Sequence, residues 1–327
     1  MTGIGERALI AAVTERLGVP GGGRLLHGPG DDAAVVRPGG VEVVSVDMVA
    51  EGVHFERTTH SAADVGHKAL GSALSDVAAM GAEPGEAYVG LALPPGTPEA
   101  WALELVDGIE ALARRTGVAV AGGDVVSASA LVISVTVTGW AEAAKRLVTR
   151  GGARAGHLVG VTGRLGGAAA GLLLLSGASV GLDEEVREGL LARHRRPEPR
   201  LAAGRALAEA GASALIDLSD GVATDAEHLS RESGVALVLH LPALPRAAGI
   251  DEVAEATGRD PSELAATGGE DYELLFTAPP ERRGALEEAG ARVGAPVSWL
   301  GRVERGNGAR LLDGSGRAVS LAGYEHA

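Results

Sequence analysis

The chain of 327 residues contains no cysteine. This absence excludes disulfide bonds, thiolate zinc sites, iron–sulfur clusters and a cysteine nucleophile. Aromatic residues make up only 2% of the sequence, so it offers little material for the stacking platforms that bind single-stranded nucleic acids. No segment is as long and apolar as a membrane span, and the first residues lack the pattern of a signal peptide. We therefore expect a cytoplasmic protein without a membrane anchor.

Basic residues are also scarce relative to acidic ones. The chain has 29 lysines and arginines against 43 aspartates and glutamates, which gives a formal charge of -14. Such a charge disfavours nucleic acids and anionic membrane surfaces as partners, whereas bound cations would neutralise part of it. The sequence has no G-x-x-x-x-G-K-[ST] loop, and the glycine-rich segment 160–167 departs from G-x-G-x-x-G. We expect neither a P-loop nor a Rossmann dinucleotide site.

The most informative feature present is a series of carboxylates framed by glycine and other small residues. Most of these carboxylates follow apolar stretches and precede turns, where a backbone can approach a ligand closely. Hard cations such as Mg²⁺ take oxygen ligands and commonly bridge to substrate phosphates. The pattern therefore indicates metal-bound phosphate chemistry. The motifs are Gly30-Asp31-Asp32-Ala33, Ser45-Val46-Asp47, Leu74-Ser75-Asp76, Gly122-Gly123-Asp124, Ile216-Asp217-Leu218-Ser219-Asp220-Gly221 and Gly268-Gly269-Glu270-Asp271.

The length suits two compact domains of mixed α/β character. A basic, glycine-rich stretch begins at Lys145, and we expect residues 1–145 and 146–327 to form the two domains. Apolar periodicity predicts the elements in each. The predicted helices are 6–17, 63–80, 98–115, 166–175, 199–210 and 222–233. The predicted strands are 41–46, 88–93, 118–121, 131–138, 157–161, 214–217 and 273–276.

Each acidic motif also has an ordinary structural interpretation. Asp47, which is expected at the end of strand 41–46, could equally be the first residue of a turn. Gly122 to Asp124 are expected in a loop after strand 118–121, which could be an ordinary one. Ser219 or Asp220 could cap the helix that begins at Val222, which would leave Asp217 unexplained. For Glu273 we expect a solvated loop.

Two further residues have both an ordinary and a functional interpretation. Arg150 carries a forked group that suits a phosphate, although most surface arginines bind nothing. His54 is a lone histidine, a type that more often makes a structural hydrogen bond than a substrate contact.

Taken in order, the motifs resemble those of thiamine-monophosphate kinases almost from end to end. The resemblance extends to Glu51-Gly52-Val53-His54-Phe55, Leu147-Val148-Thr149-Arg150-Gly151 and Tyr272-Glu273-Leu274. That family is related to aminoimidazole ribonucleotide synthetase. The resemblance implies the two-domain fold of that synthetase, with an N-terminal domain that binds metal and ATP and dimerises through its sheet. It also implies a C-terminal α/β domain that completes an active-site cleft.

The resemblance further implies transfer of the ATP γ-phosphoryl group to thiamine monophosphate, the last step of thiamine diphosphate biosynthesis. The acceptor oxygen is already anionic, so no general base is required. Several Mg²⁺ ions and an arginine relieve the repulsion between the two anions. Direct in-line transfer is therefore expected.

Site residues follow from the same resemblance, position by position. Val46 replaces the family's usual threonine, so only its carbonyl group is available to a metal. The implied magnesium ligands are Asp32, Ser45, Val46, Asp47, Asp76, Asp124, Asp217 and Asp220. The implied ATP contacts are Gly123, Asp124, Arg150 and Ser219. The implied thiamine phosphate contacts are His54, Glu270 or Asp271, and Tyr324. The residues expected to act in catalysis are Asp47, Asp76, Asp124, Asp217 and Arg150.

Two alternatives remain open at this point. One is aminoimidazole ribonucleotide synthetase activity, an ATP-dependent ring closure. The other is a non-catalytic metal- or nucleotide-binding protein that keeps the acidic scaffold. The absence of cysteine argues against the related selenophosphate synthetase and carbamoyl dehydratase, which both require one.

Overall fold

The computed structural model describes residues 6–17, 24–29 and 33–324. The predicted metal ligand Asp32 therefore lies outside the described residues. The chain divides into two compact units. Unit 1 consists of Met1–Val77 and Ala82–Ala144, and unit 2 of Ala78–Gly81 and Lys145–Ala327. Each unit is described by itself below.

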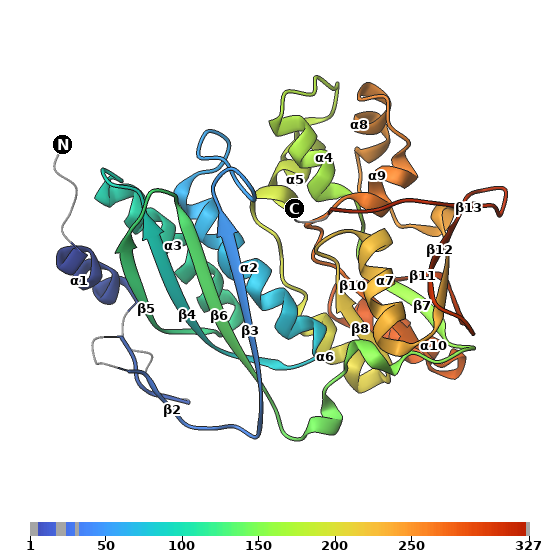
Figure 1. Cartoon of the computed structure of the whole chain (residues 1–327), viewed down its shortest axis with the longest axis horizontal. Helices are drawn as coiled ribbons and strands as arrows, with labels where there is room; N and C mark the ends of the chain where they lie inside the picture. The colour runs from blue at the N-terminus through green and yellow to red at the C-terminus, as the bar shows by residue number, and fades with distance from the viewer. Residues whose placement is uncertain (1–5, 18–23, 30–32, 325–327) are drawn as a thin grey trace. The chain divides into compact units, whose positions relative to one another are not determined.

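Unit 1 is built on a four-stranded sheet with the strand order β3-β6-β4-β5. Its strands are β3 (Val41–Ala50), β4 (Glu83–Leu93), β5 (Ala119–Ser127) and β6 (Val132–Ala141). Strand β6 is antiparallel to both β3 and β4, whereas β4 and β5 are parallel. Helices α2 (Ala62–Ala79) and α3 (Glu99–Thr116) cover one face (Figure 1). Helix α1 (Glu6–Leu17) and the short strands β1 (Leu25–His27) and β2 (Val35–Val36) complete the unit.

Apolar periodicity predicted these elements because one face of each is buried. Ile133, Val135 and Val137 of β6 are at most 1% exposed and alternate with partly exposed residues, as a half-buried strand requires. Helix α2 carries an apolar stripe as predicted, but it is buried almost all round, since Ala63 and Asp76 are the residues of this helix that are not fully buried. Helix α3 ends at Gly117, whose φ of 78° is a left-handed conformation that glycine adopts without strain.

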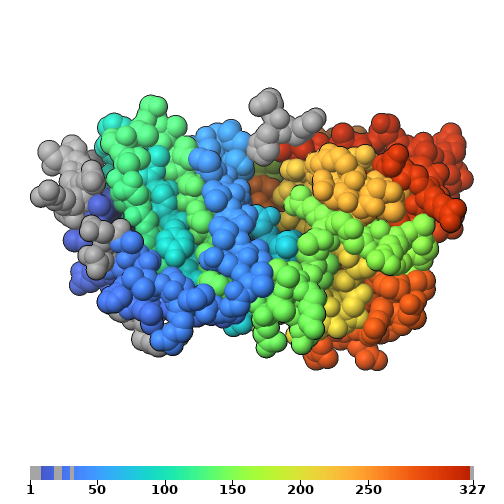
Figure 2. Space-filling view, turned by 60° about the horizontal axis from the view of Figure 1, so that its bottom comes forward, coloured from blue at the N-terminus to red at the C-terminus, as the bar shows by residue number. Residues whose placement is uncertain are grey.

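The other face of this sheet carries exposed apolar side chains. Val44, Val46 and Met48 of β3 are 58%, 61% and 54% exposed. Figure 2 shows strands of this sheet at the surface, with β3 in blue and the others in cyan to green. An apolar strand face of this kind is typical of a surface that binds a partner.

Two local predictions for unit 1 were wrong. Asp47 does not end a strand, because β3 continues to Ala50 and pairs with β6 over its whole length. Gly122 to Asp124 do not form a loop but lie within β5, opposite β4. Glycine is unusual inside a strand, which is why the sequence indicated a loop. Here it permits close approach, since a Cβ atom on Gly123 would lie 2.1 Å from the carbonyl oxygen of Val89.

Unit 2 is built on a seven-stranded, mostly antiparallel sheet with the order β13-β12-β9-β11-β7-β10-β8. Its strands are β7 (Leu158–Thr162), β8 (Ala214–Asp217), β9 (Ala236–His240), β10 (Leu274–Ala278), β11 (Val297–Glu304), β12 (Gly308–Leu312) and β13 (Ala318–Val319). Its helices are α4 (Gly167–Leu175), α5 (Glu184–Arg195), α6 (Leu201–Ala210), α7 (Val222–Ser233), α8 (Ile250–Ala256), α9 (Pro261–Thr267) and α10 (Arg283–Arg292). The predicted α/β class is confirmed, and the predicted elements of this unit are all present. The sequence analysis missed β9, β11 to β13, α5 and α8 to α10. Among the residues described, no helix is long and apolar enough to cross a membrane.

The prediction of a solvated loop for Glu273 was also wrong, because its side chain is 0% exposed. Arg200 binds it with two guanidinium nitrogens, at 2.9 Å from Nε to Oε2 and 2.5 Å from Nη2 to Oε1. The hydroxyl group of Thr162 donates a further hydrogen bond at 2.7 Å. Both partners are more than 70 residues away in the sequence, so local pattern could not reveal the pairing. The buried carboxylate is therefore a structural anchor next to the Glu270-Asp271 motif.

We expect Arg200→Ala to destabilise unit 2 by about 3–5 kcal/mol, because it leaves a buried carboxylate without its cation. The matched control is Arg302→Ala, which breaks an exposed pair with Glu304 and should cost at most about 1 kcal/mol. Urea unfolding of both variants measures the difference. Equal losses in the two variants would show that the Arg200–Glu273 pair does not stabilise the unit.

Candidate active site

Three predicted metal ligands of unit 1 gather where β3 meets α2. Ser45 and Asp47 lie two residues apart on β3 and so point to the same face of the sheet. The hydroxyl group of Ser45 donates a hydrogen bond to Oδ2 of Asp76 at 2.5 Å, which identifies that face as the one covered by α2. The side chain of Val46 points the other way and is 61% exposed. A metal contact through the carbonyl group of Val46 stays a prediction.

Asp124 is not part of this group. Asp47 pairs with Val135, Val135 with Val89, and Val89 with Gly123. Residues paired across a sheet share a face, so Asp124, one position beyond Gly123, points to the face opposite Asp47. Three strand spacings of about 4.8 Å also separate β3 from β5. Within unit 1 the structure therefore brings Ser45, Asp47 and Asp76 together and leaves Asp124 apart.

Asp124 lies instead at a cavity of about 720 Å³ within unit 1. The cavity is mainly apolar, with Gly122 and Gly123 of β5 on its wall. Its volume is in the range of small-molecule sites, in which a few polar groups are set among apolar ones. The predicted ATP contacts Gly123 and Asp124 thus lie together in a place where a ligand fits, and their role stays a prediction.

His54 follows β3 in a turn and makes a structural hydrogen bond. Its Nδ1 atom accepts the backbone N–H of Ala50 at 3.2 Å. This contact agrees with the ordinary interpretation of a lone histidine. A contact with thiamine phosphate remains a prediction.

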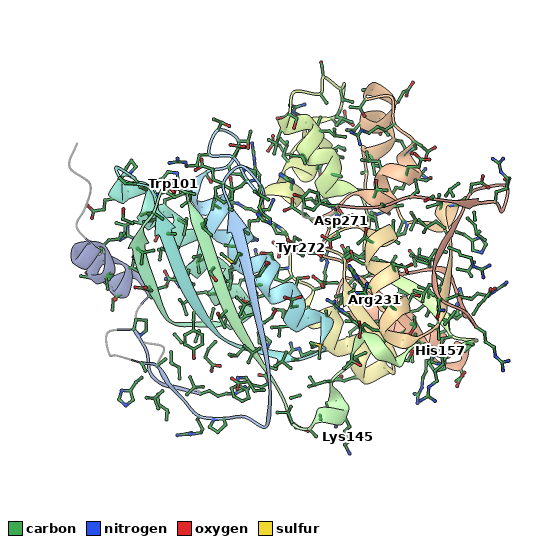
Figure 3. The ribbon with its side chains drawn as sticks, in the orientation of Figure 1. Trp101, Lys145, His157, Arg231, Asp271 and Tyr272 are labelled. Carbon is green, nitrogen blue, oxygen red and sulfur yellow. The ribbon has the colours of Figure 1, made fainter. Side chains whose placement is uncertain are left out.

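In unit 2 the two acidic motifs lie side by side. Strand β8 ends at Asp217, which is 4% exposed, and the chain then forms the loop 218–221 before α7. The loop 268–273 is bonded to it through main-chain groups. The N–H of Tyr272 donates to the carbonyl of Leu218 at 2.9 Å, and that of Glu270 to Ser219 at 2.7 Å. Figure 3 labels Asp271 and Tyr272 in this second loop.

The loop 268–273 is held in a strained conformation. Glu270 and Tyr272 have φ angles of 65° and 49°, which non-glycine residues rarely adopt and which cost about 1–3 kcal/mol each. The buried His194 of α5 lies 3.2 Å from the carboxylate of Glu270, Nδ1 to Oε2. Such strain clusters at functional sites, where surrounding contacts enforce it.

Asp271 has a structural task at the start of α4. Its carboxylate accepts the backbone N–H groups of Gly166 and Ala168, which helix α4 leaves without internal partners. Burial raises the pKa of Asp271 to about 7, although these two hydrogen bonds oppose the increase. Glu270 and Asp271 are the two candidates for the substrate contact, and Asp271 is thus the one whose carboxylate is already hydrogen-bonded to main-chain N–H groups.

The alternative in which Ser219 or Asp220 caps α7 does not hold. Gly221, which has no side chain, occupies the cap position of α7. The loop is instead fixed by Asp225 of α7, whose Oδ2 accepts the N–H of Asp220 at 3.1 Å. The pKa of Asp225 is raised to about 8, first by burial and then by the charges of Asp217 and Asp220.

Arg150 and Asp220 lie at opposite ends of α7. The carbonyl of Arg150 accepts a hydrogen bond from Ser233, the last residue of α7, at 2.6 Å. Asp220 precedes the first residue of this helix, whose 12 residues span about 18 Å. Thr149, the residue before Arg150, accepts the N–H of Leu215 at 3.3 Å, so Arg150 also lies beside strand β8, which ends at Asp217. Its contact with ATP stays a prediction. Tyr324, by contrast, donates its N–H to the carbonyl of Asp220 at 2.9 Å.

Sequence reasoning missed several candidate functional residues. Two of them are Asp225 and His228, which each offer one ligand atom within 4.8 Å of each other and of a ligand atom of the predicted residue Asp220. The i, i+3 spacing of Asp225 and His228 on a helix directly after the Asp217 motif was an available signal. Lys68 of α2 is 0% exposed and lies two helical turns before Asp76. A lysine this buried is exceptional, but nothing in its local sequence indicated it.

The mixed sheet and its acidic loops place the chain in a known class. The model for the N-terminal domain of AIR synthase related proteins matches residues 30–141. A structure of the hydrogenase maturation protein HypE from Escherichia coli shares the fold, with a TM-score of 0.80 at 22% identity and coverage of 98% of each chain. Residues 30–141 thus match the N-terminal domain of that family, and the chain has the same fold as HypE.

Relatives of higher identity define the family. The thiamine-monophosphate kinase of Mycobacterium tuberculosis H37Rv is 39% identical over 298 residues, 89% of this chain and 83% of the relative. That of Escherichia coli K12 is 34% identical over 303 residues, 91% of each. The crystal structure of the Stenotrophomonas maltophilia K279a kinase superposes with a TM-score of 0.81 at 34% identity, covering 96% of each chain. The chain belongs to the thiamine-monophosphate kinase family and is an enzyme, a kinase, as the motif resemblance predicted.

Proposed function

We propose that the protein transfers the γ-phosphoryl group of ATP to the phosphate of thiamine monophosphate, forming thiamine diphosphate and ADP. The observation that carries this proposal is the set of oxygen donors in each unit, Ser45, Asp47 and Asp76 in one and Asp217, Ser219 and Asp220 in the other. A related structure supports both substrates. AaThiL complexed with AMPPCP and TMP is 33% identical, with a TM-score of 0.78 and coverage of 88% of this chain and 87% of that one. AMPPCP is an analogue of ATP.

The donor chemistry of both groups fits magnesium. Carboxylate and hydroxyl oxygens are the ligands that Mg²⁺ takes, and it is commonly shared with substrate phosphates. Asp47 and Asp76 would hold it in unit 1, and Asp217 and Asp220 in unit 2. When bound, the metal neutralises charge on the two phosphate groups that must approach each other. Residues 1–145 would then serve metal and ATP binding, and residues 146–327 would complete the site.

Direct in-line transfer is the mechanism that these residues suit. The acceptor oxygen of thiamine monophosphate is anionic near neutral pH, so no side chain has to remove a proton. The sequence has no cysteine, and the hydrogen bond of His54 to the main chain gives it a structural task. The task of the protein is therefore to position phosphates and balance their charge, which is the dominant requirement of phosphoryl transfer. A cytoplasmic location belongs to this proposal, since the reaction consumes ATP.

The proposed activity is tested by measuring ADP release with ATP and Mg²⁺ and identifying products by mass. Three acceptors are compared, namely thiamine monophosphate, thiamine and formylglycinamidine ribonucleotide. We expect thiamine diphosphate from the monophosphate and no product from the other two. Turnover of the ribonucleotide alone would favour the synthetase activity, and saturable ATP binding without turnover would favour a binding protein.

For the metal ligands, we expect Asp47→Asn and Asp76→Asn to lower kcat by about 10²-fold or more, because each removes a charge that holds the metal. Thermal unfolding without metal should change little. The control is Asp107→Asn on α3, at an exposed carboxylate paired with Arg16, which should retain full activity. Near-normal rates for both site variants at saturating Mg²⁺ would refute the assignment.

We also propose that two copies of the chain pair through the apolar face of the unit 1 sheet. Val44, Val46 and Met48 of β3 and Val126 of β5 are 48–61% exposed on their strands. The first three lie on the face opposite the helices, because they alternate with Ser45 and Asp47. A row of this kind is stabilised when a second sheet covers it.

The double substitution Val44→Glu and Met48→Glu should convert a dimer into a monomer, because it places charges in the covered face. Light scattering of purified protein across micromolar concentrations measures the mass. Leu172→Glu is the control, since Leu172 is 48% exposed on α4 of unit 2 and should not affect pairing. A monomeric unsubstituted protein, or a dimeric double variant, would contradict the proposal.

A further inference from the structure

The main chain of the predicted ligand Asp220 is held by contacts with other elements. Its N–H donates to Oδ2 of Asp225 at 3.1 Å, and its carbonyl accepts the N–H of Tyr324 at 2.9 Å. The residues before it are fixed as well, since the carbonyl groups of Leu218 and Ser219 accept N–H groups from the loop 268–273. The peptide units on both sides of Asp220 are thereby fixed.

Asp225 is suited to this task by its burial. It is 2% exposed and lies in the first turns of α7, so its carboxylate faces back toward the loop that precedes the helix. The carboxylate also accepts a hydrogen bond from the main chain of Gly221. A buried carboxylate is stable only when it is hydrogen-bonded, and here the loop supplies those donors. The loop and Asp225 therefore depend on each other.

The second contact comes from the end of the described chain. The N–H of Gly323 donates to the hydroxyl group of Thr224 at 2.9 Å, which docks this segment on α7. A Cβ atom on Gly323 would lie 1.9 Å from the carbonyl oxygen of Asp220. The position therefore requires glycine, because only glycine allows the two backbones to approach this closely.

We infer that Asp225 and the segment Gly323–Tyr324 are positioning elements that hold the carboxylate of Asp220 in place for a divalent cation. This inference rests on the proposed function, in which Asp220 is a metal ligand. Outer contacts that orient metal ligands contribute about 10–100-fold to metal affinity. Neither Asp225 nor Gly323 is assigned to contact a substrate.

Substitutions at Asp225 separate positioning from ligation. Asp225→Asn retains an oxygen that accepts the N–H of Asp220, whereas Asp225→Leu has a similar shape and no acceptor. If Asp225 positions Asp220, we expect the leucine variant to weaken Mn²⁺ binding about 10-fold or more and the asparagine variant to keep most of the affinity. Electron paramagnetic resonance of Mn²⁺ in the presence of ATP measures binding without requiring turnover. Equal losses in both variants would overturn positioning, because they would indicate that the charge of Asp225 itself is needed.

Gly323→Ala tests the second element without altering the core of unit 2. We expect it to raise the Mg²⁺ concentration for half-maximal turnover about 10-fold or more while the KM for thiamine monophosphate changes much less. The control is Gly314→Ala, where an added Cβ would lie 3.9 Å from its nearest neighbour, Cγ of Pro242, an ordinary contact. Gly323→Ala also keeps the inference testable if Asp225→Leu does not fold. Unchanged metal dependence in Gly323→Ala would overturn the role of the terminal segment.

These experiments distinguish failure of the inference from failure of the proposed function. If the unsubstituted protein binds Mn²⁺ but converts no thiamine monophosphate, the proposed reaction fails and the binding measurements still decide the role of Asp225. If Asp220→Asn binds Mn²⁺ as the unsubstituted protein does, or if the latter binds none, Asp220 is not a ligand and the inference is overturned.

Discussion

Repulsion between carboxylates is the constraint on which the site depends. Asp217, Asp220 and Asp225 lie close together in unit 2, and the pKa of Asp225 is raised first by its burial and then by the charges of Asp217 and Asp220. Two of them are almost fully buried, at 4% and 2% exposure. Anions held this close are stable only with nearby donors or a cation. In unit 1 the hydroxyl group of Ser45 performs the same task for Asp76.

The fold meets this constraint mainly with main-chain donors. Amide N–H groups are fixed by the secondary structure, so they bind an oxygen atom without ordering a further side chain. Asp225 takes the amide of Asp220, and Asp271 takes two amides at the start of α4. The positive φ angles of Glu270 and Tyr272 follow from the same arrangement, since these residues donate their own amides to the loop 218–221. The backbone strain in the loop 268–273 is therefore offset by the hydrogen bonds that fix the loop 218–221.

The sequence predicted the features that depend on a pattern within one helix or strand. It missed the features that depend on partners far away in the chain. Alternating apolar residues predicted β6, and a stripe of apolar residues at helical spacing predicted α2, because both patterns repeat within one element. The motif order identified the family, and the Asp217 motif lies between a strand and a helix as expected. Asp47 and Gly123 were misplaced because pairing with β6 and β4 extends their strands. Glu273 was misjudged because Arg200 lies 73 residues before it, and the capping task of Asp271 depends on α4 in the same way.

The predicted acceptor is already anionic, and the chain has no cysteine that could act as a nucleophile. Both features explain why the acidic residues serve to hold charges and not to form covalent bonds. An anionic acceptor needs no base and no nucleophilic side chain, so catalysis reduces to holding charges at fixed positions. In such a site the residues that touch phosphate or metal are no more important than those that fix them. A shift of about 1 Å in a ligand can cost about 10²-fold in rate. In the proposed site Asp225, which is buried and accepts the amide N–H of Asp220, would therefore matter as much as the carboxylates that the motifs reveal.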